Sequence, residues 1–271
     1  MQTLANQPIF NLPLVPKNPK ALEQEKNIKA VLFDLFDTLL IIHDEHECYT
    51  KSLDKLHKTL LRNGFNCSFT DFNNSYLKSI EQIEAQTASS LEEPHFKTYI
   101  QNALSDLGYT VSRKDISVSM ATDEFCIEFA RHIQVDFHAA TVLKLIQSKY
   151  KTALISNLSF SECAWELLTA HNLAVFFDFI VVSGDVNMRK PDPKIFKMAL
   201  DRLGVSASEA VFVGDNLETD IKGALNCGMI PIHINRHKTE KTKISCKPYM
   251  AVSSLEQVLL ILEELEEEIV C

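Results

Sequence analysis

Short runs of apolar residues recur along the chain, with turn residues or polar segments between them. Runs of about four to eight apolar residues are typical of strands buried on both faces, as in a parallel sheet. The pattern therefore predicts five buried strands. They are expected at residues 28–33, 152–156, 176–183, 210–214 and 229–234.

Helical patterns separate the last four of these runs. Ser159 and Glu162 have the spacing of a capping box, which predicts a helix start. Asp192 followed by Pro193 is typical of an N-cap and first helical turn, and Gly228 is placed to end the helix before the last run. Alternating strands and helices predict an α/β fold with a doubly wound parallel sheet.

The first two predicted strands are separated by a segment far longer than an ordinary connection. Its apolar residues recur at helical spacing in four places, which predicts a helical insert. The insert follows the carboxyl end of a strand, where doubly wound sheets bind ligands, so we expect a lid over the site. The four expected helices lie around residues 53–60, 72–83, 96–104 and 116–129.

These patterns divide the chain into three parts. We expect residues 27–41 and 138–271 to form a Rossmann-like α/β core, and residues 42–137 to form the helical cap. Residues 1–26 contain prolines and little periodicity, which favours an irregular N-terminal extension.

Charge and composition narrow the classes of partner. The net charge of −9 and the absence of a dense Lys/Arg cluster argue against nucleic-acid binding and favour a small phosphorylated substrate. The seven cysteines form no C-x-x-C pair, which indicates free thiols in a reducing compartment. No apolar run is long enough to cross a membrane, and a signal-peptide pattern is absent, so we expect a cytoplasmic protein. The oligomeric state stays open.

Polar residues follow four of the predicted strands directly. Because parallel strands end at one edge of a sheet, these side chains are expected to meet there. Three clustered carboxylates repel one another unless a cation lies among them, and magnesium prefers such oxygen ligands. A lysine, a hydroxyl and an amide supply groups that hold phosphate. The residues are Asp34, Ser156, Asn157, Lys190, Asp215 and Asp220.

In their order and spacing, these residues resemble the four motifs of haloacid dehalogenase-like (HAD) superfamily hydrolases with a helical C1-type cap. Asp34 and Thr38 match the strand followed by D-x-D-x-T, and Ser156 with Asn157 matches the Ser/Thr-Asn motif. The third and fourth motifs, a lysine before Pro-Asp-Pro and G-D-x-x-x-x-D, are matched by Lys190, Gly214, Asp215 and Asp220.

The resemblance implies a role for each residue. Asp34 would attack phosphorus and form an aspartyl-phosphate, and Lys190 would neutralise charge in the transition state. Thr38, Ser156 and Asn157 would hold phosphate or support the loop. Magnesium would be bound by four groups: Asp34, the backbone carbonyl of Phe36, Asp215 and Asp220.

Phe36 departs from the family pattern. Phosphatases of the superfamily carry aspartate two residues after the nucleophile, where it protonates the leaving group and activates water. Phenylalanine cannot transfer a proton, and general acid–base help contributes roughly 10²–10⁴-fold to rate. We therefore expect slow turnover of substrates with poor leaving groups, unless His43 or His46 near the cap entry supplies the proton.

Two other functions remain open from the sequence. One is a 2-haloacid dehalogenase, since halide leaves without a proton, although Asp215 would repel the carboxylate of a haloacid unless a metal is bound. The other is a binding or regulatory protein of low turnover, for which Phe36 is the main argument. The favoured function is a magnesium-dependent phosphatase.

Overall fold

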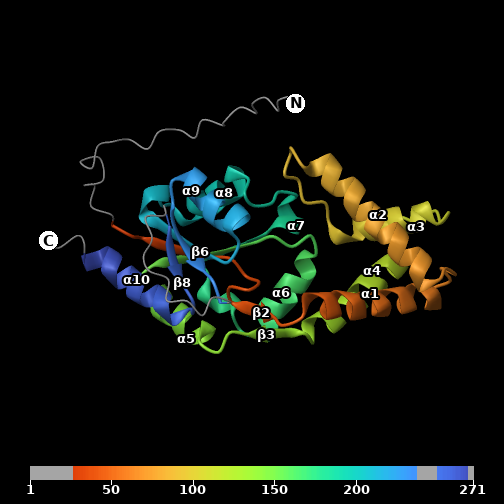
Figure 1. Ribbon diagram of the computed structural model, residues 1–271, viewed down its shortest axis with the longest axis horizontal. Coiled ribbons are helices and arrows are strands. Elements are labelled where there is room, and N and C mark those ends of the chain that lie inside the picture. The colour runs from red at the N-terminus through yellow and green to blue at the C-terminus, as the bar shows by residue number, and fades with distance from the viewer. Residues whose placement is uncertain (1–26, 237–248, 268–271) are drawn as a thin grey trace, which may run out of the picture.

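The computed structural model of the chain describes residues 27–236 and 249–267. The expected N-terminal extension, residues 1–26, lies outside the described residues. Figure 1 shows an α/β core with four helices of the insert on one side of it. The predicted α/β fold with a helical insert is confirmed.

Within the described residues, the core contains a parallel sheet of six strands in the order β5-β4-β1-β6-β7-β8. The five predicted strands are present, and β8 was not predicted. The third is shorter than predicted because residues 174–176 form a 3-10 turn. The strands are β1 (Ala30–Phe33), β4 (Lys151–Ser156), β5 (Phe179–Val182), β6 (Ala210–Gly214), β7 (Ile230–Ile234) and β8 (Met250–Val252).

Alternate residues of β1 pack on opposite faces of the sheet, as the period of a strand requires. Val31 and Phe33 belong to the apolar cluster that includes residues of α5, α6 and α10, whereas Ala30 and Leu32 belong to the cluster formed with α8 and α9. β1 is therefore buried on both faces. These helices are α5 (Ala139–Gln147), α6 (Ser161–Ala170), α8 (Pro193–Leu203), α9 (Lys222–Cys227) and α10 (Glu256–Glu267).

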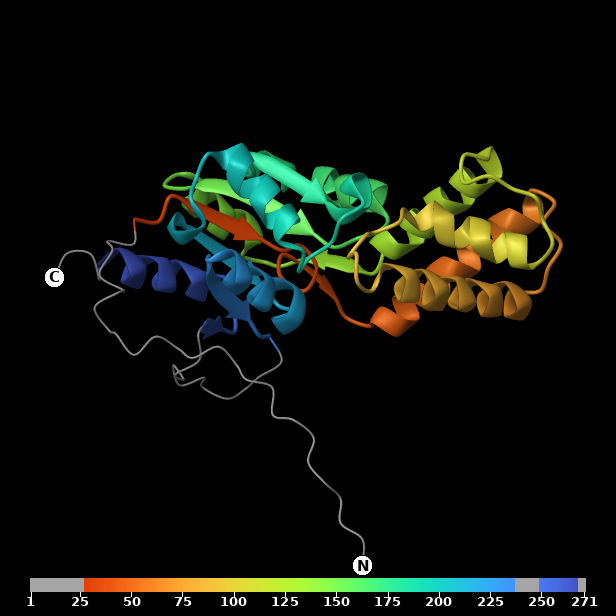
Figure 2. The same cartoon turned by 90° about the horizontal axis from the view of Figure 1, so that it is seen from above.

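The insert contains the four predicted helices, which extend away from the core in both views (Figures 1 and 2). A short antiparallel ribbon of β2 and β3, which the sequence did not predict, lies where the chain enters and leaves the insert. The elements are β2 (Leu40–Ile42), α1 (Glu45–Arg62), α2 (Phe69–Thr87), α3 (Phe96–Asp106), α4 (Ile116–Ala130) and β3 (Ile133–Val135).

Local capping signals had mixed outcomes. Asp192 caps α8 by accepting a bond from the backbone N–H of Lys194 at 2.9 Å, as predicted. Gly228 ends α9 in a left-handed conformation, also as predicted. The capping box of Ser159 and Glu162 is wrong, because α6 begins at Ser161 and has no side-chain cap.

Glu162 instead serves the contact between core and insert. Its carboxylate accepts from His95 at 2.8 Å and from Lys97 at 3.1 Å, and both residues belong to the insert. A tertiary contact has thus replaced the local cap. None of the described helices is long and apolar enough to cross a membrane.

Candidate active site

The predicted site residues meet because the strands that carry them are neighbours. β1 lies between β4 and β6, and all three run parallel. Asp34 directly follows β1 and its N–H donates to the carbonyl of Val213 in β6 at 2.9 Å. Ser156 ends β4 and Asp215 directly follows β6. These residues lie at the carboxyl edge of the sheet. β1 is the strand from which the sheet is built outward in both directions, and doubly wound sheets bind ligands beside such a strand.

Lys190 is the centre of the polar contacts at this edge. Its Nζ lies 2.6 Å from Asp34 Oδ1 and 2.7 Å from Asp220 Oδ1, and it donates to the carbonyl of Ile155 at 2.8 Å. The residue is only 2% exposed. A buried ammonium needs such partners to offset the loss of hydration. Its three donors are therefore directed at fixed positions.

The main chain of Lys190 is fixed by Asn157. The side-chain amide of Asn157 donates to the Lys190 carbonyl at 2.9 Å, and its Oδ1 accepts from the Lys190 N–H at 2.8 Å. Both polar ends of the Asn157 side chain are thus engaged in holding the lysine. Asn157 therefore positions Lys190. Its side-chain groups are used in this contact rather than directed at a phosphate, as the sequence had led us to expect.

Asp34, Asp215 and Asp220 form a carboxylate cluster. Each offers one oxygen, and these oxygens lie within 4.8 Å of one another. Counting Lys190, the four ionised side chains carry a net charge of −2. This charge and the all-oxygen donor set fit one divalent cation of the hard, oxygen-binding kind.

Without a bound cation, burial and mutual repulsion raise the pKa of two carboxyl groups in the cluster. Burial, with a contribution from Asp220, raises the pKa of Asp34 to about 6, although Lys190 acts in the opposite direction. Burial and the charges of Asp34 and Asp220 raise the pKa of Asp215 to about 7. Burial would lower the pKa of Lys190, but Asp220 and Asp34 raise it, so the ammonium is retained.

The turn after β6 places Asp220 against the strand end. A Cβ atom added to Gly214 would lie 2.4 Å from Asp220 Oδ2, so only glycine leaves room for this carboxylate. The N–H of Asn216 donates to the same oxygen at 3.1 Å, and the Asn216 side chain caps the π-helical turn Leu217–Ile221. The spacing of the G-D-x-x-x-x-D motif follows from this turn.

The turn after β1 fixes the nucleophile candidate. The hydroxyl of Thr38 donates to Asp34 Oδ2 at 3.1 Å, while Lys190 holds the other oxygen. Asp37 has a left-handed backbone with φ of 53°, and its Oδ1 accepts from the N–H of Ile42 at 3.3 Å. Asp37 therefore supports the turn.

Phe36 contacts the insert. Its ring lies edge-on to Phe129 of α4, with 5.9 Å between ring centroids. An aromatic contact of this kind contributes about 0.5–1.5 kcal/mol beyond burial. Position 36, where the family resemblance led us to expect an acid, thus holds a contact between the turn after β1 and the insert.

Ser156 carries a polar group without a partner. Its hydroxyl is fully buried and makes no hydrogen bond to any of the residues that the structure describes. Leaving a buried hydroxyl unpaired costs about 1–3 kcal/mol. A buried donor beside Asp34 is suited to a phosphate oxygen.

Two site residues were missed by the sequence analysis. Arg236, after β7, donates to the backbone carbonyl of Asp37 at 3.0 Å and to that of Thr38, and it pairs with Asp136 at 2.6 Å. His233 Nε2 bonds to the carbonyl of Asp215 at 2.8 Å. Both hold the main chain of the turns after β1 and β6 from β7 and the residues just after it, which lie far along the chain from Asp37 and Thr38.

His43 and His46, the candidates for an alternative acid, are both exposed. His43 bonds through Nε2 to the side chain of Gln134 at 2.8 Å, across the β2–β3 ribbon. This contact gives His43 a structural role at the entry to the insert.

Comparison with known proteins defines the class of this fold and site. The family model for haloacid dehalogenase-like hydrolases matches residues 28–228. This range includes the carboxylate cluster, Lys190 and the whole insert. The chain belongs to the haloacid dehalogenase-like hydrolases.

Its relatives of known activity include phosphatases. The chain is 29% identical over 240 residues to glyceraldehyde 3-phosphate phosphatase of Pyrococcus furiosus, covering 88% of this chain and 94% of that protein. It is 31% identical over 217 residues to the enzyme of the same name from Methanopyrus kandleri, covering 78% and 85%. The chain is a hydrolase, and both of these relatives are named as phosphatases.

Solved structures show the same fold. A HAD phosphatase from Thermococcus onnurineus matches with a TM-score of 0.61 and 25% identity, covering 87% of this chain and 98% of that one. A 2-haloacid dehalogenase from Pseudomonas syringae matches with a TM-score of 0.63 and 24% identity, covering 88% and 99%. The second likeness concerns the fold alone.

Proposed function

We propose that the protein is a magnesium-dependent phosphatase of a small phosphorylated metabolite, with Asp34 as nucleophile. The observation that carries this proposal is the buried Lys190 held between Asp34 and Asp220, within a cluster whose net charge suits a divalent cation. The phosphatase relatives, aligned over most of the chain, support the same reaction.

The carboxylate cluster and the backbone carbonyl of Phe36 would hold the magnesium ion. When bound, the ion would neutralise the cluster and let an anionic phosphate approach the Asp34 carboxylate. Burial and mutual repulsion raise the pKa of Asp34 and of Asp215. The ionised carboxylates therefore need a positive charge between them, which supports a cation site.

The chain's own residues define the remaining steps. The Asp34 carboxylate attacks phosphorus, the bond to the leaving oxygen breaks, and an aspartyl-phosphate forms. Lys190 keeps Asp34 oriented and places positive charge beside the transferred group, and the free hydroxyl of Ser156 binds one of its oxygens. Water then cleaves the acyl phosphate and restores Asp34.

Phe36 determines which leaving groups are suitable. No proton comes from position 36, so the leaving oxygen takes its proton from water or from the substrate. The lost acid corresponds to about 3–5 kcal/mol of barrier. We infer that acyl or enol phosphates, which leave as stable anions, are better substrates than simple alkyl phosphates. The names of the relatives make three-carbon phosphates the first compounds to test.

Dehalogenation is the second candidate, and the absence of an acid at position 36 is the observation that favours it. Asp215 opposes it, because its charge lies with that of Asp34 at the mouth of the site. A low-turnover binding protein is the third, and it predicts that phosphate on Asp34 persists.

The deciding experiment is a panel of phosphorylated metabolites and 2-haloacids, assayed with magnesium and with a chelator. We expect phosphate release that needs magnesium and is absent in Asp34→Asn. Halide release that survives chelation would establish the dehalogenase instead. Mass spectrometry of the quenched enzyme separates the third candidate, since a phospho-adduct on Asp34 that does not decay would identify it.

A further inference from the structure

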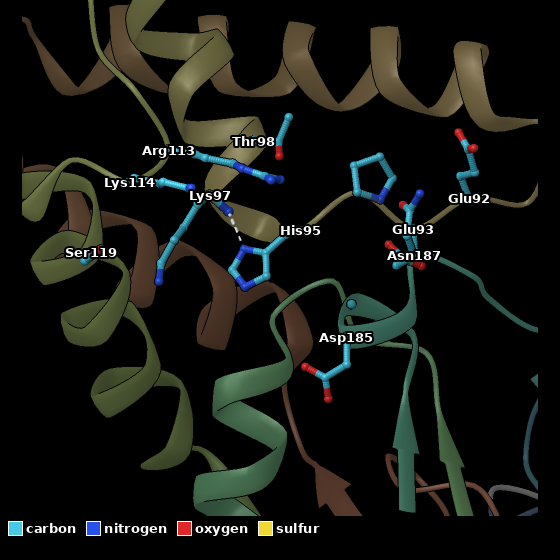
Figure 3. Close-up of a pocket in the computed structure, with 12 residues that line it drawn as sticks. Glu92, Glu93, His95, Lys97, Thr98, Arg113, Lys114, Ser119, Asp185 and Asn187 are labelled. Carbon is cyan, nitrogen blue, oxygen red and sulfur yellow. Dashed lines mark hydrogen bonds between the residues drawn. The ribbon is translucent and has the colours of Figure 1, made fainter.

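A second pocket lies where the insert meets the core, apart from the carboxylate cluster. Its volume is about 760 Å³, within the range of sites for small molecules. The insert supplies the α2–α3 connection, the start of α3 and the turn before α4, and the core supplies the short helix α7 (Ser183–Val186) with Asn187. Figure 3 shows these segments around one opening. No member of the carboxylate cluster lines it.

The charged side chains of this pocket are separated by sign. Lys97, Arg113 and Lys114 lie together on one side in Figure 3, and Glu92 and Glu93 lie on the other. Asp185 approaches from the core below them. A ligand spanning the opening would therefore meet positive groups at one end and negative groups at the other.

Three of the six charged side chains have partners among the described residues (Lys97, Glu93 and Asp185), and three do not. Lys97 pairs with Glu162, and Asp185 accepts from Trp165 at 2.9 Å. Arg113 and Lys114 are exposed, and neither side chain has an ion pair within residues 27–236 and 249–267. The chain as a whole carries a net charge of −9, whereas this side of the pocket carries an unpaired guanidinium beside an unpaired ammonium and is locally positive. Such a pair binds carboxylate or phosphate groups.

The opposite wall suits a cation. Glu92 is exposed and its side chain has no ion pair to any described residue, and Asn187 offers an amide beside it. An ammonium group placed there would gain charge-assisted hydrogen bonds that a neutral group would not.

We propose that this pocket binds a small zwitterion, with a carboxylate or phosphate at Arg113 and Lys114 and an ammonium at Glu92 and Asn187. The ligand would touch the insert and the core at once. Its affinity would then depend on their juxtaposition, and its binding would favour the state in which the cap lies against the core. The inference does not depend on the reaction proposed for the carboxylate cluster.

Trp165 makes the proposal directly testable. It is the only tryptophan of the chain, and its indole N–H bonds to Asp185, which lines the pocket. We would titrate the full-length, metal-free protein with glutamate, with glutarate, which lacks the ammonium, and with 2-amino-3-phosphonopropionate, and follow Trp165 fluorescence and heat. None of these probes contains a phosphate ester that the enzyme could hydrolyse.

We expect saturable binding of at least one of the two amino compounds, about tenfold tighter than that of glutarate, which corresponds to about 1.4 kcal/mol. Tighter binding of the phosphonate would identify phosphate as the preferred anion, and tighter binding of glutamate would identify carboxylate. Arg113→Ala/Lys114→Ala should weaken binding by about tenfold or more, as expected for lost charge-assisted bonds.

The control is Lys55→Ala/Lys144→Ala, which removes two exposed positive charges outside the pocket and should leave binding unchanged. Glu92→Gln should weaken the amino compounds and leave glutarate unaffected. The proposal is overturned by the absence of saturable binding, by affinity for both amino compounds no higher than for glutarate, or by equal losses in the pocket and control variants.

Discussion

The carboxyl group of Asp215 should make the proposed metal binding depend on pH. Its pKa in the folded chain is about 7, raised from 3.8 by burial and by the neighbouring carboxylates. A group whose pKa is raised on folding stabilises the folded state at acid pH, and this contribution is lost as the pH rises through the folded value. Between about pH 4 and pH 7, the metal-free protein should therefore lose stability.

In the proposed site magnesium binds the ionised carboxylate, so we expect magnesium to offset this loss of stability. We expect the increase in melting temperature caused by magnesium to be larger at about pH 8 than at about pH 5.5, where a proton competes with the ion. The effect of Asp215 should stay below about 1.4 kcal/mol per pH unit, since its side chain is partly exposed. Asp215→Asn should remove most of the difference, and an equal magnesium shift at both pH values would contradict the assignment.

In the proposed reaction, Phe36 should make the rate depend on the leaving group. Phe36→Asp should raise kcat for alkyl phosphates by about 10²-fold, the lower end of the range for general acid help, and raise it much less for an aryl phosphate with a good leaving group. Phe36→Asn is the matched control, since it removes the same ring without adding a proton donor. If both variants lower kcat for alkyl phosphates equally, the missing acid does not limit the rate.

At the scale of elements, the turn between β6 and the π-helical segment depends on one glycine. Gly214→Ala would bring a Cβ atom to 2.4 Å from Asp220 Oδ2. The carboxylate must move, which weakens its pairing with Lys190, and overpacking of this kind costs about 1–3 kcal/mol. We expect a lower melting temperature and a strong loss of magnesium affinity, measured by calorimetry. Gly204→Ala strains a left-handed backbone (φ 65°) away from the cluster, so it is the control for general destabilisation, and comparable magnesium loss there would refute the steric account.

Strands and helices were predictable from sequence where a single local pattern determined them. β1 and β6 are buried on both faces, so their apolar runs were unambiguous. The capping box failed because Glu162 finds partners in the insert, which a local pattern cannot include. The ribbon of β2 and β3 was missed because each strand has three residues, too short for a clear alternation.

The candidate site was predictable for a topological reason. Parallel strands end at one edge of the sheet, so the order of strands and connections in the sequence predicts that Asp34, Lys190 and Asp215 lie together. Arg236 and His233 were missed because they act on backbone carbonyls of distant turns. Contacts of a side chain with remote main chain leave no spacing pattern in the sequence.

At the scale of the whole molecule, Arg189 joins the insert to Lys190, the residue that follows it. Its N–H donates to the carbonyl of Leu91 at 3.0 Å, and its guanidinium donates to Thr87 at 3.3 Å and lies 3.9 Å from Glu93. Because Lys190 is the following residue, displacement of the α2–α3 connection is transmitted to the site.

Arg189→Gln should loosen this junction while leaving the backbone contact in place. We expect faster amide hydrogen exchange at residues 88–95, a higher KM and a loss of about 1–3 kcal/mol in stability, since Glu93 stays buried without its cation. Arg131→Gln is the control, because Arg131 pairs only with Glu128 at the end of its own helix. Unchanged exchange at residues 88–95 would show that Arg189 does not hold the insert.

The edge-on contact of Phe36 with Phe129 also constrains how this protein can change over evolutionary time. A mutation that places an acid at position 36 removes an aromatic ring that packs between the core and the insert. The same substitution would add a proton donor and remove the aromatic contact with α4. We expect a second substitution in α4 to be needed to compensate for the lost contact. Lineages that keep phenylalanine here are thus expected to retain an aromatic partner opposite it.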